Sequence, residues 1–233
     1  MFLAIDTSLG TAVAVVEDDG VIAAQATSSD PRGHAEVIGT LIQRALAEAS
    51  VDASAIDAVA AGMGPGPFTG LRVGIAAART FALGRGIPVI PVASHDAVAL
   101  ELLLFDALAG GFQDAPDEPF AVVTDARRRE FAYTVYRGLD ADGLPVRVAE
   151  PALTPRDDLD GILETGSILR RDAEAIPAGM LGLVAARAVA AGRSVASSDA
   201  LYLRSPDVTM PHGPKKVTPA AAAGAGAADG GTR

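Results

Sequence analysis

The sequence predicts an α/β fold in which helices cover a layered sheet. Short apolar runs rich in valine and alanine alternate with helical segments, in the order βββαβαβα through Leu108. Hydrophobic residues make up 49% of the 233 positions, which is enough apolar surface for a buried core. Disorder along the whole chain is therefore excluded.

Three strands are predicted at the start of the chain. Apolar runs occupy residues 2–5, 11–16 and 21–27, and turn-forming residues fill positions 6–10 and 18–20 between them. These strands are expected to form a meander at one edge of a sheet.

An amphipathic helix is predicted over residues 34–49. Its apolar residues fill an arc close to half of the helix surface, and Ile38, Ile42 and Leu46 lie within that arc. Packing on one sheet needs a narrower stripe, so the pattern permits a second apolar neighbour. A helix enclosed in the chain's own core is the alternative.

The next segments continue the alternation of strands and helices. A buried strand over residues 56–61 leads into a glycine- and proline-rich loop at 62–70, and a helix follows over 71–83. A strand at 87–92 precedes a helix that Ser94 or Asp96 caps.

A domain boundary is predicted in residues 110–119, which are rich in glycine, proline and acidic side chains. The predicted units are a first domain over 1–109, a reduced second domain over 110–210 and a disordered tail over 211–233. The second unit is expected to contain strands at 120–124 and 131–136, a weak strand at 146–148 and a helix that begins near Met180.

Composition excludes several chemistries. The chain has no cysteine, which rules out disulfides, zinc–thiolate sites and cysteine nucleophiles. Its net charge of −10 argues against a surface that holds nucleic acid unaided. The N-terminal residues lack the form of a secretory signal, and no apolar run is long enough to span a membrane. A cytoplasmic location is expected.

The turn between the first two strands carries polar side chains that could hold phosphate oxygens, a metal or a water molecule. The alternative is that these residue types are simply those of which turns are made. The candidate residues are Asp6, Thr7, Ser8 and Thr11.

The loop GMGPGPFTGLRVG at residues 62–74 is the second candidate, because glycines admit a ligand and the following helix start can bind an anion. It is neither a Walker A loop nor a dinucleotide fingerprint. A structural tight loop is the alternative. The candidate residues are Gly64, Gly66, Phe68, Thr69 and Gly70.

The histidines do not form a predicted metal site. A helical His-x-x-x-His pair would place two ligands on one face, but Ala99 stands four residues after His95 and Ile38 four residues after His34. No G-x-S-x-G elbow is present, so no catalytic residue is assigned. Arginines 127–129 could meet an anionic partner, with a solvated turn as the alternative.

Five segments of this chain resemble one family. MFLAIDTSLGTAVAVV, RGHAEVI, GPGPFTGLRVGIAAARTFALGRGIPVIPV, DARRREFAY and LYLRSP occur in order over residues 1 to about 210. Together they are similar to TsaB (YeaZ), the smaller actin-like subunit of the bacterial machinery that makes threonylcarbamoyladenosine in tRNA. The segment LDGILETGSILRR departs from the Gly-Asp-Gly turn expected there.

This resemblance implies an ASKHA (actin/hexokinase-like) fold with a complete N-terminal domain and a reduced C-terminal one. It also implies a non-catalytic subunit that binds a TsaD-type catalytic partner, together with a TsaE-type ATPase, and that meets tRNA only through the complex. No cofactor is expected on this chain alone, and whether ATP or ADP binds at the complex interface stays open from the sequence. The residues assigned to the partner interface are Ala35, Ile38, Ile42, Leu46, Leu71, Ile75 and Arg79.

Two other functions remain open from the sequence. An ASKHA phosphotransferase or ATPase would use residues 6–11 and the loop at 64–70. A metallopeptidase would need the second histidine that Ala99 replaces. The free protein is expected to form a weak homodimer through its apolar helix face.

Overall fold

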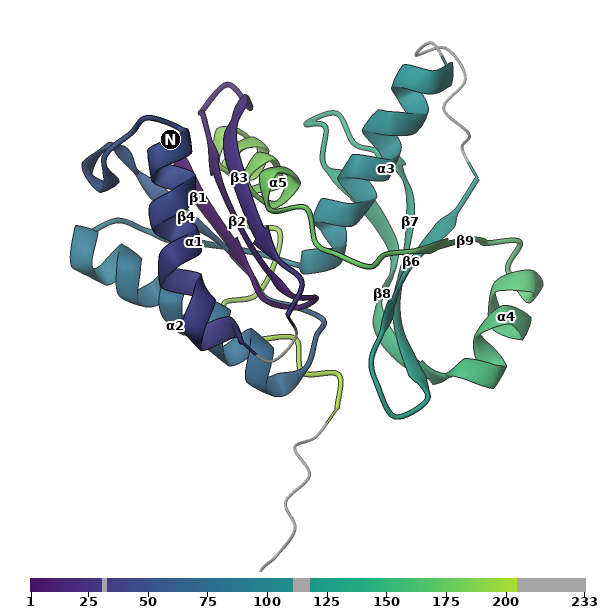
Figure 1. Ribbon diagram of the computed structural model, residues 1–233. Helices are drawn as coiled ribbons and strands as arrows, with labels where there is room; N and C mark the ends of the chain where they lie inside the picture. Colours follow the sequence, from purple (N-terminus) through teal and green to yellow (C-terminus); the bar gives the residue numbers. More distant parts are fainter. Residues whose placement is uncertain (31–32, 111–117, 205–233) are drawn as a thin grey trace, which may run out of the picture.

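The chain folds around two β-sheets (Figure 1). The computed structural model describes residues 1–30, 33–110 and 118–204. The first sheet has the order β3-β2-β1-β4-β5. Its strands are β1 (Phe2–Asp6), β2 (Thr11–Val16), β3 (Ile22–Ser28), β4 (Ala58–Gly62) and β5 (Val89–Val92).

The second sheet repeats the topology of the first without its last strand. Its order is β8-β7-β6-β9, and its strands are β6 (Phe120–Asp125), β7 (Glu130–Leu139), β8 (Pro145–Pro155) and β9 (Leu169–Asp172). In both sheets an antiparallel meander is followed by a strand that pairs in parallel with the first strand of the meander. The predicted α/β class is confirmed, with a complete first sheet and a reduced second one.

Helices connect and cover these sheets. They are α1 (His34–Glu48), α2 (Phe68–Arg85), α3 (Ser94–Gly110), α4 (Arg156–Thr165) and α5 (Ala178–Ala190), with a 3₁₀ turn at Ala53–Ala55. No helix in the described ranges is long and apolar enough to cross a membrane.

Side-chain alternation along β1 and β2 divides the core around the first sheet into two layers. Leu3 and Ile5 pack with residues of α1 and α2, whereas Phe2 and Ala4 pack with residues of α3 and α5. Helices cover both faces of the first sheet, which explains why the sequences of β1 and β2 are nearly continuous apolar runs.

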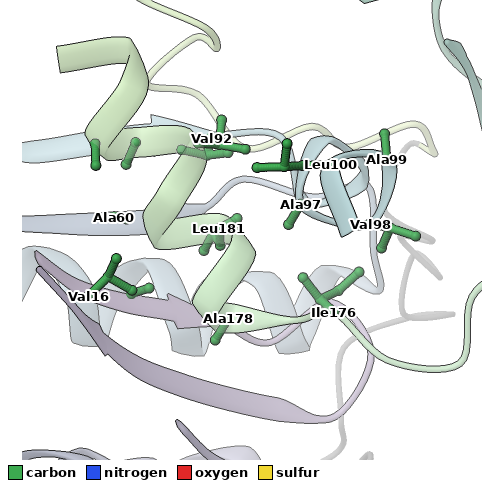
Figure 2. Packing of buried hydrophobic residues seen from close by; sticks show 14 of the residues in the cluster. Val16, Ala60, Val92, Ala97, Val98, Ala99, Leu100, Ile176, Ala178 and Leu181 are labelled. Carbon is green, nitrogen blue, oxygen red and sulfur yellow. The ribbon is translucent and has the colours of Figure 1, made fainter. Parts of the chain in front are cut away.

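Helix α5 returns from the second half of the chain to the first sheet (Figures 1 and 2). Leu181 lies among Val16, Ala60 and Val92. Close approach requires small residues, because a Cβ on Gly182 would lie 2.6 Å from Val16 Cγ2 and one on Gly179 would lie 2.6 Å from Ile22 Cδ1. The predicted second unit therefore contributes a helix to the core of the first.

Several boundaries differ from those predicted. Helix α2 begins at Phe68 rather than at residue 71, and Pro67, whose backbone is extended, is its N-cap. The weak strand at 146–148 extends to the eleven residues of β8, and α4 and β9 were not predicted. The tail at 211–233 and residues 111–117 of the predicted boundary lie outside the described residues.

A buried ion pair joins α3 to the second sheet. The Asp96 carboxylate accepts hydrogen bonds from Tyr136 Oη at 2.7 Å and Arg147 Nε at 2.8 Å, and it also pairs with Arg147 Nη2. Arg147 Nη2 donates to the Val195 carbonyl at 2.9 Å. Ser94 or Asp96 was predicted to cap this helix, and the Asp96 carboxylate is committed to these contacts between the two halves.

Removing the arginine should leave a buried carboxylate without its counter-charge. We expect Arg147→Met to lower the free energy of unfolding by about 3–5 kcal/mol, measured by urea denaturation. Arg44→Met is the control, because Arg44 forms an exposed pair with Glu48 at 2.7 Å and its loss should cost about 0–1 kcal/mol. Equal losses in the two variants would contradict the assigned role of Arg147.

Candidate functional site

The turn after β1 packs directly against the glycine-rich loop and the first turns of α2. A Cβ on Gly66 would lie 2.9 Å from Ser8 Cα, and one on Gly70 would lie 2.6 Å from the Thr7 carbonyl oxygen. Side chains on Gly62 and Gly74 would overlap the Asp6 carboxylate and the Thr7 hydroxyl. The absence of a side chain at these four glycines therefore leaves the space that residues 6–8 of the same chain occupy.

The Asp6 carboxylate is the centre of a buried polar network. Its Oδ1 accepts the Ser8 N–H at 2.7 Å, and its Oδ2 accepts the Ser94 hydroxyl at 2.5 Å. Ser94 Oγ also accepts the Gly64 N–H at 3.1 Å and lies 2.8 Å from Ser8 Oγ. Burial raises the pKa of Asp6, although the hydrogen bonds from Ser94 and Ser8 oppose the shift. The network ties β1, the loop and α3 together.

The neighbouring threonine hydroxyls also have partners within the chain. Thr7 Oγ1 donates to the Gly70 carbonyl at 2.7 Å and accepts the Gly74 N–H at 3.1 Å. Thr11 Oγ1 lies 2.8 Å from His34 Nδ1. This part of the predicted phosphate loop is buried, and its side chains hydrogen-bond mainly to other groups of the chain. The residues that are at most 2% exposed are Asp6, Thr7, Ser8 and Thr11.

The rest of the predicted loop lies nearer the surface. Gly64 is buried, whereas Gly66 and Phe68 are half-buried and Thr69 is exposed. The centroid of the Phe68 ring lies 4.8 Å from that of Tyr202. The Arg72 guanidinium lies over the Phe68 ring, 3.8 Å from its centroid. The C-terminal residues of the described chain therefore pack on the start of α2.

A cleft lies between the two halves of the molecule, formed by two adjoining cavities of about 310 and 420 Å³. One wall comes from the β1–β2 turn and the start of α2, and the other comes from the β6–β7 turn. Residues that line both cavities are Ser8, Leu9, Pro67, Asp125 and Arg127.

The β6–β7 turn has an unusual backbone. Arg127, Arg128 and Arg129 all have left-handed conformations, with φ of 62°, 52° and 63°. Asp125 Oδ1 accepts the Arg127 N–H at 2.7 Å, and it pairs with Arg156 Nη2 at 2.7 Å. The sequence indicated a turn here but gave no sign that Arg127 and Arg128 face the cleft.

His95 is a buried imidazole held between two hydroxyls of the second sheet. Its Nδ1 lies 2.8 Å from Thr134 Oγ1 and its Nε2 lies 3.0 Å from Thr124 Oγ1. Burial, with a smaller contribution from the charge of Arg147, lowers the pKa of His95 to about 3, so the ring is neutral near pH 7. Ala99 is also fully buried. In the described residues, no three acidic or histidine side chains form a group that could hold a metal ion.

Three of the residues predicted for a partner interface are core residues. Ile38 of α1 and Leu71 and Ile75 of α2 are 8% exposed or less and pack against residues of the first sheet, so they have almost no surface to offer. Ala35 and Arg79 are exposed, and Ile42 and Leu46 are half-buried. Arg79 Nη2 donates to the Ser198 carbonyl at 2.6 Å. Of the residues predicted for the interface, only four keep exposed surface: Ala35, Ile42, Leu46 and Arg79.

The family described as "tRNA N6-adenosine threonylcarbamoyltransferase" (TsaD) matches residues 20–150, more than half of the chain. An uncharacterized protein of Mycobacterium tuberculosis is 39% identical over 160 residues, which are 68% of this chain and 66% of that protein. The match thus spans slightly less than two thirds of the relative's length. A tRNA N6-adenosine threonylcarbamoyltransferase of Streptococcus uberis is 43% identical over 39% of this chain and 32% of its own length.

Two solved structures have the same fold. An uncharacterized Pseudomonas aeruginosa protein "with similarity to peptidase YEAZ" has a TM-score of 0.68 and 26% identity, covering 87% of this chain and 99% of the other. YeaZ from Pseudomonas aeruginosa has a TM-score of 0.67 and 24% identity with the same coverage. The predicted ASKHA-type fold and the predicted resemblance are confirmed.

The neutral His95 should make the fold sensitive to acid. Below its unfolded pKa of 6.5 the unfolded chain binds a proton that the folded chain binds only near pH 3, so stability is lost as pH falls through this range. We expect a contribution of about 1.4 kcal/mol per pH unit to the free energy of unfolding. His95→Gln should remove this contribution, measured as the difference between wild type and variant in urea denaturation at pH 7, 6, 5 and 4. Parallel pH profiles would contradict it.

Proposed function

The chain belongs to the TsaD family of tRNA N6-adenosine threonylcarbamoyltransferases, on its TsaB (YeaZ)-like side, and we propose that it is a non-catalytic subunit that binds a TsaD-type partner. The observation that carries this proposal is the structural match to the YeaZ-like protein, which includes 99% of that chain. The proposed setting is a cytoplasmic complex for tRNA threonylcarbamoyladenosine synthesis. A TsaE-type ATPase is its third component, ATP or ADP lies at the complex interface, and tRNA is met only through the complex.

The environment of His95 supports a role without catalysis of its own. A metal ligand needs a nitrogen lone pair that faces an open site, but both ring nitrogens of His95 lie at hydrogen-bond distance from threonine hydroxyls. Ala99 has no coordinating atom and packs in the core. A metal-dependent transfer reaction would therefore depend on residues of the partner.

The outer surface of α1 supports the proposal of a partner interface. Helices α1 and α2 lie side by side on one face of the first sheet, opposite α5 (Figure 1). Ile42 and Leu46 keep part of their apolar surface exposed there, although both also contact the core. A helix of the partner packed along this surface would bury them completely.

Mixing the purified chain with the TsaD-type protein of the same organism should give a 1:1 complex. Size-exclusion chromatography with light scattering measures its mass, and circular dichroism shows that both components are folded. Two folded proteins that elute separately at micromolar concentration would overturn the proposal. The same measurement on the chain alone tests the expected weak homodimer.

A charge placed on the proposed interface should weaken the complex without affecting the fold. Ala35 is exposed in the first turn of α1, where a carboxylate also suits the helix dipole, so Ala35→Glu should fold normally. We expect it to weaken partner binding by about a hundredfold, because an unpaired charge becomes buried at the interface. Gln43→Glu adds the same charge to an exposed position of the same helix and should change the Kd less than about threefold. Equal effects of the two variants would contradict an interface at Ala35.

A further inference from the structure

We propose that a groove between α2 and the last described residues of the chain receives an acidic helix of the TsaD-type partner, and that Arg72 and Arg79 recognise its carboxylates. This inference rests on the proposed function and names the chemistry of the partner's contact. The groove has a volume of about 550 Å³ and is separate from the cleft, with which it shares only Tyr202 as a lining residue.

The C-terminal residues form a fixed wall of this groove. The Leu201 N–H donates to the Met63 carbonyl at 2.7 Å, and Arg79 Nη2 donates to the Ser198 carbonyl at 2.6 Å. An aromatic contact at the start of α2 adds to these hydrogen bonds. Because residues 198–202 are anchored to the first half of the molecule, the groove is formed before a partner binds, which lowers the cost of ordering it.

Helix α2 is a basic element of an acidic protein. Its 18 residues include three arginines and no aspartate or glutamate, whereas the whole chain carries a net charge of −10. Arg72 and Arg79 line the groove, and Arg85 does not. Neither of the two lining arginines forms an ion pair within the described ranges of the chain. Two cations that the chain leaves without a counter-charge favour a partner that supplies carboxylates.

The surface between the two arginines is apolar. Ile75 and Ala76 line it from α2, and Ala200 lines it from the opposite wall. One turn beyond Arg79 along the helix, Leu83 is 84% exposed. Small and apolar side chains between two charges suit a packed protein segment, because RNA would need further phosphate contacts where this groove offers alanine and isoleucine.

The spacing of the two arginines indicates that the partner segment is a helix. Residues 72 and 79 are separated by two helical turns, so they share one side of α2 and lie about 10 Å apart along its axis. Carboxylates at positions i and i+7 of a helix packed along α2 have the same spacing. The expected segment is therefore an amphipathic helix with two acidic residues two turns apart and small or apolar residues between them.

One carboxylate of the chain also lines the groove. Asp199 is exposed on the C-terminal wall, where solvent screens its charge. In the part of the chain that the structure describes, it forms no ion pair with either arginine. With two cations against one screened anion, the groove keeps an excess of positive charge.

The experiment is a calorimetric titration of the full-length chain with the TsaD-type protein of the same organism, at about 50 and about 300 mM NaCl. Arg72→Gln removes one cation from the groove. Ala76→Glu places a carboxylate four residues after Arg72 and three before Arg79, where it can pair with both. Arg85→Gln is the matched control, since it removes the same charge from the same helix outside the groove.

We expect Arg72→Gln to weaken binding about tenfold, because a carboxylate of the partner loses its counter-charge. Ala76→Glu should weaken it about a hundredfold, because its own carboxylate meets those of the partner. Arg85→Gln should leave the Kd within about threefold of wild type. The wild-type Kd should also rise with salt, and Arg72→Gln should reduce this salt dependence, which a purely structural role of Arg72 would not change.

Equal effects of Arg72→Gln and Arg85→Gln would overturn the proposal, because the arginines would then act through net charge alone. A complex that Ala35→Glu weakens, but that Arg72→Gln and Ala76→Glu leave unchanged, overturns this proposal and not the proposed function. A wild-type chain that does not bind the partner overturns both.

A third result would assign the arginines of α2 to nucleic acid. If Arg72→Gln leaves partner binding unchanged but weakens binding of tRNA to the assembled complex, the proposal is overturned in favour of an RNA contact. Thermal melting identifies any variant that does not fold. If Ala76→Glu is unfolded, Arg72→Gln and its matched control decide the outcome.

Discussion

The close approach of the β1–β2 turn to the start of α2 is the contact on which the rest of the structure depends. No Cβ fits at Gly62 or Gly74, because Asp6 and Thr7 occupy that space. The same contact brings Ser94 to the Asp6 carboxylate, which fixes the start of α3 relative to β1. From there, His95 and Asp96 reach the second sheet through Thr134, Tyr136 and Arg147. One turn thus positions both halves of the molecule.

This arrangement determines which groups remain for a ligand. In the turn itself, the Asp6 carboxylate and the threonine hydroxyls are bound to other parts of the chain, so they stabilise the fold. The cleft beside this turn is lined by residues from its surroundings, among them His34 and Arg127 of the β6–β7 turn. A turn rich in aspartate, serine and threonine can therefore be structural even where a cleft lies beside it.

The sequence was sufficient to predict those helices and strands whose own apolar residues follow the period of the face that they bury. The β1–β3 meander, α1 and the helix after the glycine loop were predicted because their apolar periodicity matches the faces that they bury. Helix α4 was missed because only Leu159 and Leu163 are buried and Gly161 interrupts the pattern. Strand β9, LRRD, is short and charged, and it is a strand only because β6 pairs with it. Sequence alone also could not show that α5 packs on the first sheet, since small apolar residues do not specify which sheet they meet.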